Sequence, residues 1–87
     1  MKLYYAYMRP SDVNNPESGV IATVAAYTPK QARDLVNDEL ANVYSSNVSR
    51  VYRLHNEEEE LEDPEMYEEF LHLTEPRILG IAENMRT

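Results

Sequence analysis

The chain has 87 residues, of which 43% are hydrophobic, and it carries a net charge of −8 and no cysteine. This length predicts a single domain over residues 1–87, and the missing cysteines exclude a disulfide framework, a cysteine-ligated zinc site and a thiol nucleophile. The acidic balance disfavours direct binding to nucleic acid, which depends on Lys and Arg at the phosphates.

The first third of the chain predicts two strands joined by a long loop. Residues 2–8 alternate with tyrosines on both faces, which is typical of a strand. Residues 9–18 contain Pro10 and Pro16 and are expected to form a loop, long enough to be mobile or to contact a partner. Gly19 to Tyr27 is apolar on both faces, which predicts a central strand. This longest apolar run is far below the roughly 20 residues of a membrane span, so we expect a cytoplasmic protein.

Thr28, Pro29 and Gln31 predict the start of a helix. Thr28 can cap the first amides, Pro29 suits the first helical position, and Gln31 completes a capping box. The residues that follow place one apolar face at helical spacing and predict a helix that ends near Tyr44. The members of this face are Ala32, Leu35, Val36, Leu40, Val43 and Tyr44.

Residues 48–55 alternate again and predict a third strand, in which Arg50 and Arg53 indicate an open face or edge. With Lys30 and Arg33, these arginines are the candidates for a locally basic patch. Residues 56–63 are expected to form a solvated loop.

Asp63 and Pro64 predict the cap and first residue of a second helix, which ends before Pro76. Its apolar positions are Met66, Tyr67, Phe70, Leu71 and Leu73. Residues 77–83 favour a final strand over a helix. The result is a small α+β domain of order β-β-α-β-α-β, with a helix packed on a three- to four-stranded sheet.

The segment from Val20 to Arg53 resembles small accessory proteins encoded by bacteriophages and other mobile elements. The matching features are the strand VIATVAAY, the run from Thr28 to Arg33 with its helix, and the strand VSRVYR. Small size and acidity are also similar to phage-encoded inhibitors of host machinery, including anti-CRISPR proteins. This resemblance implies a protein that binds and blocks a host protein.

An acidic segment follows the third strand. Nine of the thirteen residues from Glu57 to Glu69 are acidic, and no Lys or Arg lies between Arg53 and Arg77. Carboxylates on a helix face lie ~5–6 Å apart, and duplex DNA carries one charge per ~1.7 Å of axis, so this segment could occupy a basic groove as a mimic of DNA. The alternative is a solvated surface that only keeps the protein soluble. The candidate partner-binding residues are Glu57, Glu58, Glu59, Glu60, Glu62, Asp63, Glu65, Tyr67, Glu68 and Glu69.

No catalytic or metal-binding constellation is recognisable in the sequence. His55 and His72 stand in no known motif, and Glu68 lies four residues before His72, where an ion pair is the simpler explanation. Zinc sites need three or four converging ligands, and residues 57–63 lack the ligand pattern of a calcium-binding loop. We therefore expect no enzyme activity, no cofactor and no native metal.

These features favour a non-enzymatic binding protein that blocks a basic site on a host nucleic-acid-handling protein, such as a CRISPR-Cas complex, through residues 57–69. The alternative is a homo-oligomeric structural or adaptor module, such as a homodimer, which associates through an exposed strand edge.

Overall fold

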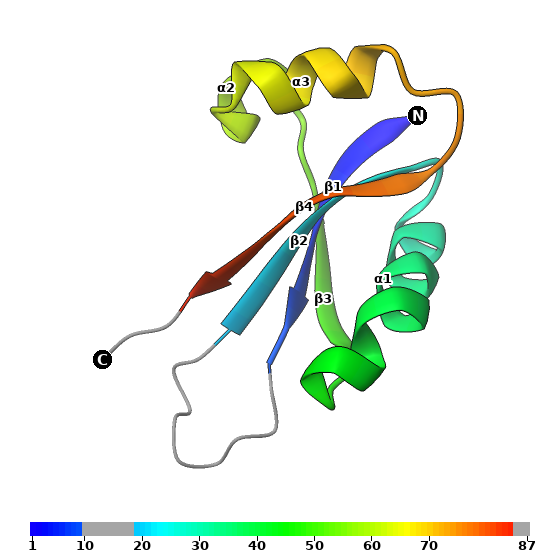
Figure 1. Cartoon of the computed structure of the whole chain (residues 1–87). Helices are drawn as coiled ribbons and strands as arrows, with labels where there is room; N and C mark the ends of the chain where they lie inside the picture. Colours follow the sequence, from blue (N-terminus) through cyan, green and yellow to red (C-terminus); the bar gives the residue numbers. More distant parts are fainter. Residues whose placement is uncertain (10–18, 85–87) are drawn as a thin grey trace.

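The computed structural model describes residues 1–9 and 19–84 and shows a four-stranded antiparallel sheet with helices on both faces (Figure 1). The strands are β1 (Lys2–Met8), β2 (Gly19–Ala26), β3 (Val48–Arg53) and β4 (Arg77–Asn84), in the order β3-β1-β2-β4. This confirms the α+β class. It also confirms that the second strand is central and that the arginine-bearing third strand is an edge. The predicted loop at residues 10–18 lies outside the described residues.

Helix α1 (Pro29–Tyr44) begins at the predicted capping box. The Thr28 Oγ1 accepts the Gln31 N–H at 3.0 Å, and the Gln31 Oε1 accepts the Tyr27 N–H at 2.7 Å. The helix ends where Ser45 takes the left-handed conformation, with φ 51°. Its buried residues are Ala32, Val36 and Leu40. The prediction for Val43 was wrong, since this residue is 68% exposed. Tyr44, predicted on the same face, does pack against the core.

Each face of the sheet has its own hydrophobic cluster. Alternation along β1 sends Tyr4, Ala6 and Met8 toward α1, where they pack in the larger cluster. Leu3 and Ala25 lie on the other face, in a smaller cluster with residues of the C-terminal helices. The sheet is therefore covered on both sides, and the apolar residues of the acidic segment, such as Leu61, pack in the smaller cluster.

The acidic segment forms two short helices, α2 (Glu57–Leu61) and α3 (Pro64–Leu71). The predicted loop at residues 56–63 was wrong, because Leu61 is buried in the smaller cluster and a turn of helix brings it there. The predicted start of the next helix at Asp63 and Pro64 is confirmed. The strand alternative for residues 77–83 is confirmed as β4, whereas β2 and β3 end one and two residues earlier than expected, at Ala26 and Arg53.

Candidate functional site

The candidate site is the surface formed by α2 and α3, which we call the acidic surface (residues 57–69) (Figure 1). Helix α2 forms despite its four consecutive glutamates, because negative charge in a first turn complements the helix dipole. The Asn56 N–H donates to the Glu60 carboxylate at 3.1 Å, and the Asn56 side-chain amide donates to Glu59 at 2.8 Å. Two of the glutamates are thus used to begin the helix.

A tight connection joins the two helices. Glu62 takes the left-handed conformation, with φ 58°, and ends α2. Asp63 then caps α3, because its Oδ1 accepts the N–H groups of Glu65 and Met66, each at 3.1 Å. Pro64 occupies the first turn, where its missing N–H costs nothing. This connection brings the end of α2 against the start of α3.

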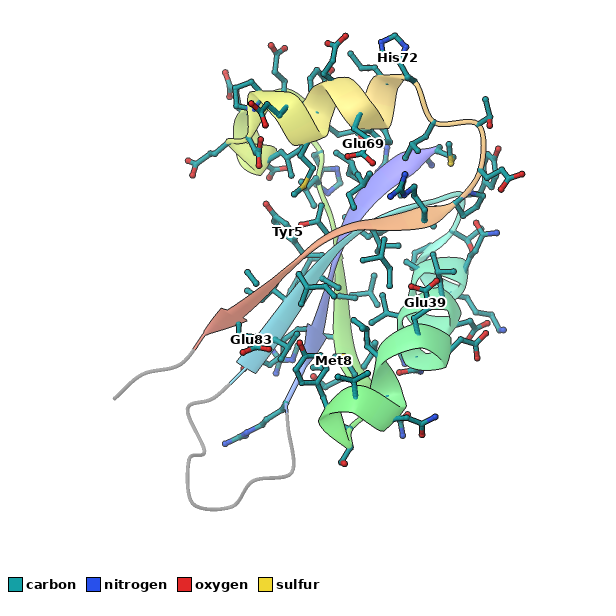
Figure 2. The ribbon with its side chains drawn as sticks, viewed as in Figure 1. Tyr5, Met8, Glu39, Glu69, His72 and Glu83 are labelled. Atoms are coloured by element: carbon teal, nitrogen blue, oxygen red, sulfur yellow. The ribbon has the colours of Figure 1, made fainter. Side chains whose placement is uncertain are left out.

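Besides Glu59, Glu60 and Asp63, three more of the predicted partner-binding carboxylates have partners within the chain. The Glu57 Oε2 accepts the backbone N–H of Leu3 at 2.8 Å, which fastens α2 to β1. Glu68 contacts His72 at 3.1 Å, and Glu69 forms an ion pair with Arg77 at 3.0 Å. Figure 2 shows Glu69 on the sheet side of α3 and His72 pointing away from the sheet. Glu57 and Glu69 therefore hold elements together as well as carrying charge.

A groove of about 540 Å³ lies between α2 and α3. Four carboxylates line it together with one aromatic and two apolar side chains. Its lining residues are Glu58, Glu62, Asp63, Pro64, Tyr67, Glu68 and Leu71. Five of these are predicted partner-binding residues, so the fold brings half of the predicted set into one concave site.

The apolar part of the groove comes from α3. Tyr67 is half-buried, and its ring packs beside Phe70 with centroids 6.2 Å apart and an interplanar angle of 36°. Leu71 is 55% exposed, although its position predicted a core residue. An aromatic ring and an aliphatic side chain surrounded by carboxylates suit a Lys or Arg side chain, whose stem is apolar and whose head is cationic.

Tyr5 is a member of this region that the sequence did not indicate. Its hydroxyl donates to the backbone oxygen of Glu60 at 3.1 Å, across 55 positions of sequence. Burial raises the pKa of Tyr5, and the carboxylates of Glu62 and Glu60 raise it further. The alternation of β1 predicts only which face of the sheet Tyr5 occupies. That this face is covered by α2, which brings Glu60 and Glu62 close to Tyr5, is seen only in the tertiary structure.

The two histidines do not come together in one site. His55 and His72 are both exposed, and His72 is engaged by Glu68. Within residues 1–9 and 19–84, no three His, Asp or Glu side chains are grouped so that they could hold a metal ion. Glu69, which could have joined Glu68 and His72, turns to Arg77 instead.

Comparisons with protein-family models, with curated proteins and with solved structures found no match to this chain. In the part of the chain that the structure describes, no helix has the length and apolar character needed to cross a membrane.

Proposed function

We propose that this is a non-enzymatic binding protein whose acidic surface occupies a basic site on a nucleic-acid-handling host protein. The observation that carries the proposal is the groove, which combines Glu58, Glu62 and Glu68 with Tyr67 and Leu71. Carboxylates that only kept the protein soluble would have no reason to surround an aromatic side chain and an exposed leucine. Aromatic anchors with a charged rim are typical of protein interfaces.

The arrangement supports charge mimicry of DNA more specifically. Glu58, Glu62 and Glu65 form no hydrogen bond through their carboxylates and no ion pair within the described residues, so their charges are available to a partner. A basic groove built for phosphates would meet several such charges over a short distance. The partner we propose is of the kind blocked by phage-encoded inhibitors, including CRISPR-Cas complexes, in line with the sequence resemblance.

The test compares three baits in bacterial lysate: wild type, E58Q/E62Q/E65Q and the control D38N/E39Q/E75Q. The control removes the same number of charges from exposed positions outside the acidic surface. The substitutions of the first variant spare Glu57, Glu60 and Glu69, which have contacts inside the chain. We expect a nucleic-acid-binding protein to be retained by wild type and by the control, and to be lost with E58Q/E62Q/E65Q.

A second step shows that the retained protein uses its nucleic-acid site. Purified partner is bound to the protein and then titrated with duplex DNA, which we expect to displace it, with weaker binding at higher salt. Equal retention by all three baits, or a complex that DNA does not displace, would contradict the proposal.

The alternative function, a homo-oligomeric module, is favoured by the two edges of the sheet, β3 and β4. Sedimentation of the isolated protein over a range of concentrations distinguishes it. A mass that rises with concentration in both wild type and E58Q/E62Q/E65Q supports the oligomer.

A further inference from the structure

Strand β3 presents unpaired backbone groups at the edge of the sheet. The Leu54 N–H, just after the strand, donates to the backbone oxygen of Leu3 in β1 at 2.9 Å. Alternate residues of an antiparallel strand face the same neighbour, so Tyr52 also turns its N–H and C=O toward β1. By the same alternation, the N–H and C=O of Val51 and Arg53 point away from β1. Because β3 is the outermost strand, these groups form a template for one more strand.

A groove runs beside this edge. It has a volume of about 430 Å³ and is lined by Pro29, Lys30, Arg33, Asp34 and Val51. Figure 1 shows β3 running alongside α1, and both the helix and the strand contribute to the lining. A groove between an edge strand and a helix accepts an extended chain, because the strand supplies backbone partners and the helix supplies side-chain contacts.

The charge of this groove is positive, unlike that of the molecule as a whole. Lys30 pairs with Asp34 at 2.8 Å, which neutralises both side chains. Arg33 and Arg53 have no hydrogen bond or ion pair through their guanidinium groups within the described residues. Arg53 faces the α1 side of the sheet, since it pairs with Tyr4 of the larger cluster. Two free arginines therefore flank the exposed backbone of β3.

We propose that β3 and this groove bind an extended acidic segment of a partner protein, which joins the sheet as a fifth strand. Side chains of that segment opposite Val51 and Arg53 would face α1, so Asp or Glu at these positions would lie beside Arg33 and Arg53. A second copy fits less well, because pairing two β3 strands would bring Arg50 and Arg53 of both copies together. The site lies on the opposite face of the sheet from the acidic surface and does not depend on the proposed function.

The probe is a capped heptapeptide of alternating threonine and glutamate, TETETET, titrated into ¹⁵N-labelled protein. In an extended strand, all three glutamates of this peptide lie on one face and all four threonines on the other. In the free protein, we expect the amide of Tyr52 to be protected from hydrogen exchange and those of Val51 and Arg53 to exchange fast. At about 1 mM peptide, we expect shifts in β3 and the first half of α1, and new protection at Val51 and Arg53.

Three variants separate backbone pairing from charge. V51P removes an N–H that faces outward, and proline is tolerated at such an edge position, so we expect the fold to survive and peptide affinity to fall about tenfold. R33Q/R53Q should weaken TETETET by a similar factor and leave its neutral analogue TQTQTQT unchanged. R50Q is the matched control, because Arg50 lies on the same strand but pairs with Tyr7 and faces the other side of the sheet. We expect it to bind like wild type.

The proposal is overturned if TETETET produces no shifts in β3, or if R33Q/R53Q and R50Q lose affinity equally. It is also overturned if Val51 becomes protected at high protein concentration without peptide, which would identify a second copy as the occupant. E58Q/E62Q/E65Q should bind TETETET like wild type, so failure at the acidic surface and failure at β3 remain distinguishable.

Discussion

Single side chains of the acidic surface differ in what their carboxylates do. Glu57 is half-buried, and its carboxylate accepts the N–H of Leu3. Leu3 lies one residue beyond the last residue of β1 that pairs with β3. Glu58 is its neighbour in sequence, is exposed, and lines the groove instead. Adjacent glutamates of identical chemistry thus have a structural role in one case and an available charge in the other.

We predict that E57A destabilises the protein by about 1–3 kcal/mol, because it leaves the amide of a fully buried residue, Leu3, without its acceptor. Urea unfolding followed by circular dichroism measures the change. E58A is the control and should alter the free energy of unfolding by less than about 0.5 kcal/mol. Equal effects of the two substitutions would show that the Glu57 contact contributes nothing.

Among the elements, α2 is the one that sequence reasoning missed. Its five residues contain one buried side chain, Leu61, and four carboxylates that repel each other. Local patterns favoured a loop, because no helical face can be recognised in so short a run. The helix is stabilised by the Asn56 contacts, by the dipole, and by the packing of Leu61 against a cluster drawn from distant strands.

The other elements were predictable because their determinants are local. Alternation identified β1 and β3, an apolar run identified β2, and the caps at Thr28 and Asp63 fixed the starts of α1 and α3. Residues 77–83 favoured the strand that became β4 over a helix. The sequence also located the acidic surface but treated its carboxylates as equivalent. Which of them remain free depends on partners such as Leu3 and Arg77, whose proximity only the tertiary fold establishes.

We predict that L61A costs about 2 kcal/mol, because it empties a position in the smaller cluster and releases α2 from the sheet. Leu71 gives a matched control in the same segment, since it is 55% exposed. L71A should cost less than about 0.5 kcal/mol but weaken binding of the partner captured by wild type. Chemical denaturation and amide exchange at Glu60 and Leu61 measure the first effect, and the pull-down measures the second. A cost for L71A equal to that for L61A would place Leu71 in the core.

At the scale of the whole molecule, charge is separated along the sequence and across the fold. Residues 1–53 carry six Lys or Arg and five Asp or Glu, a net of +1, whereas residues 54–87 carry two and eleven, a net of −9. The free arginines beside β3 and the carboxylates of the groove lie on opposite faces of one sheet. Each face can therefore attract a partner of opposite charge within a Debye length of ~8 Å.

This separation predicts that salt stabilises the protein. Raising NaCl from about 0.02 to 0.3 M should increase the free energy of unfolding by about 1 kcal/mol, because repulsion within residues 57–69 is screened. Urea unfolding at each salt concentration measures it, and E58Q/E62Q/E65Q should show a smaller increase. A decrease with salt would mean that the exposed Lys30–Asp34 and Glu69–Arg77 pairs outweigh the repulsion, although such pairs usually contribute little.

The register of β2 has a practical consequence for immobilisation. Lys2 pairs with Ala26 at one end of this strand, and Asn84 pairs with Gly19 at the other, so Lys2 and Asn84 lie at opposite ends of the sheet (Figure 1). Met1 packs against the smaller cluster beside α3. An affinity tag before Met1 would therefore crowd the acidic surface and mask a partner that binds there, whereas an attachment point at Asn84 lies at the other end of the sheet.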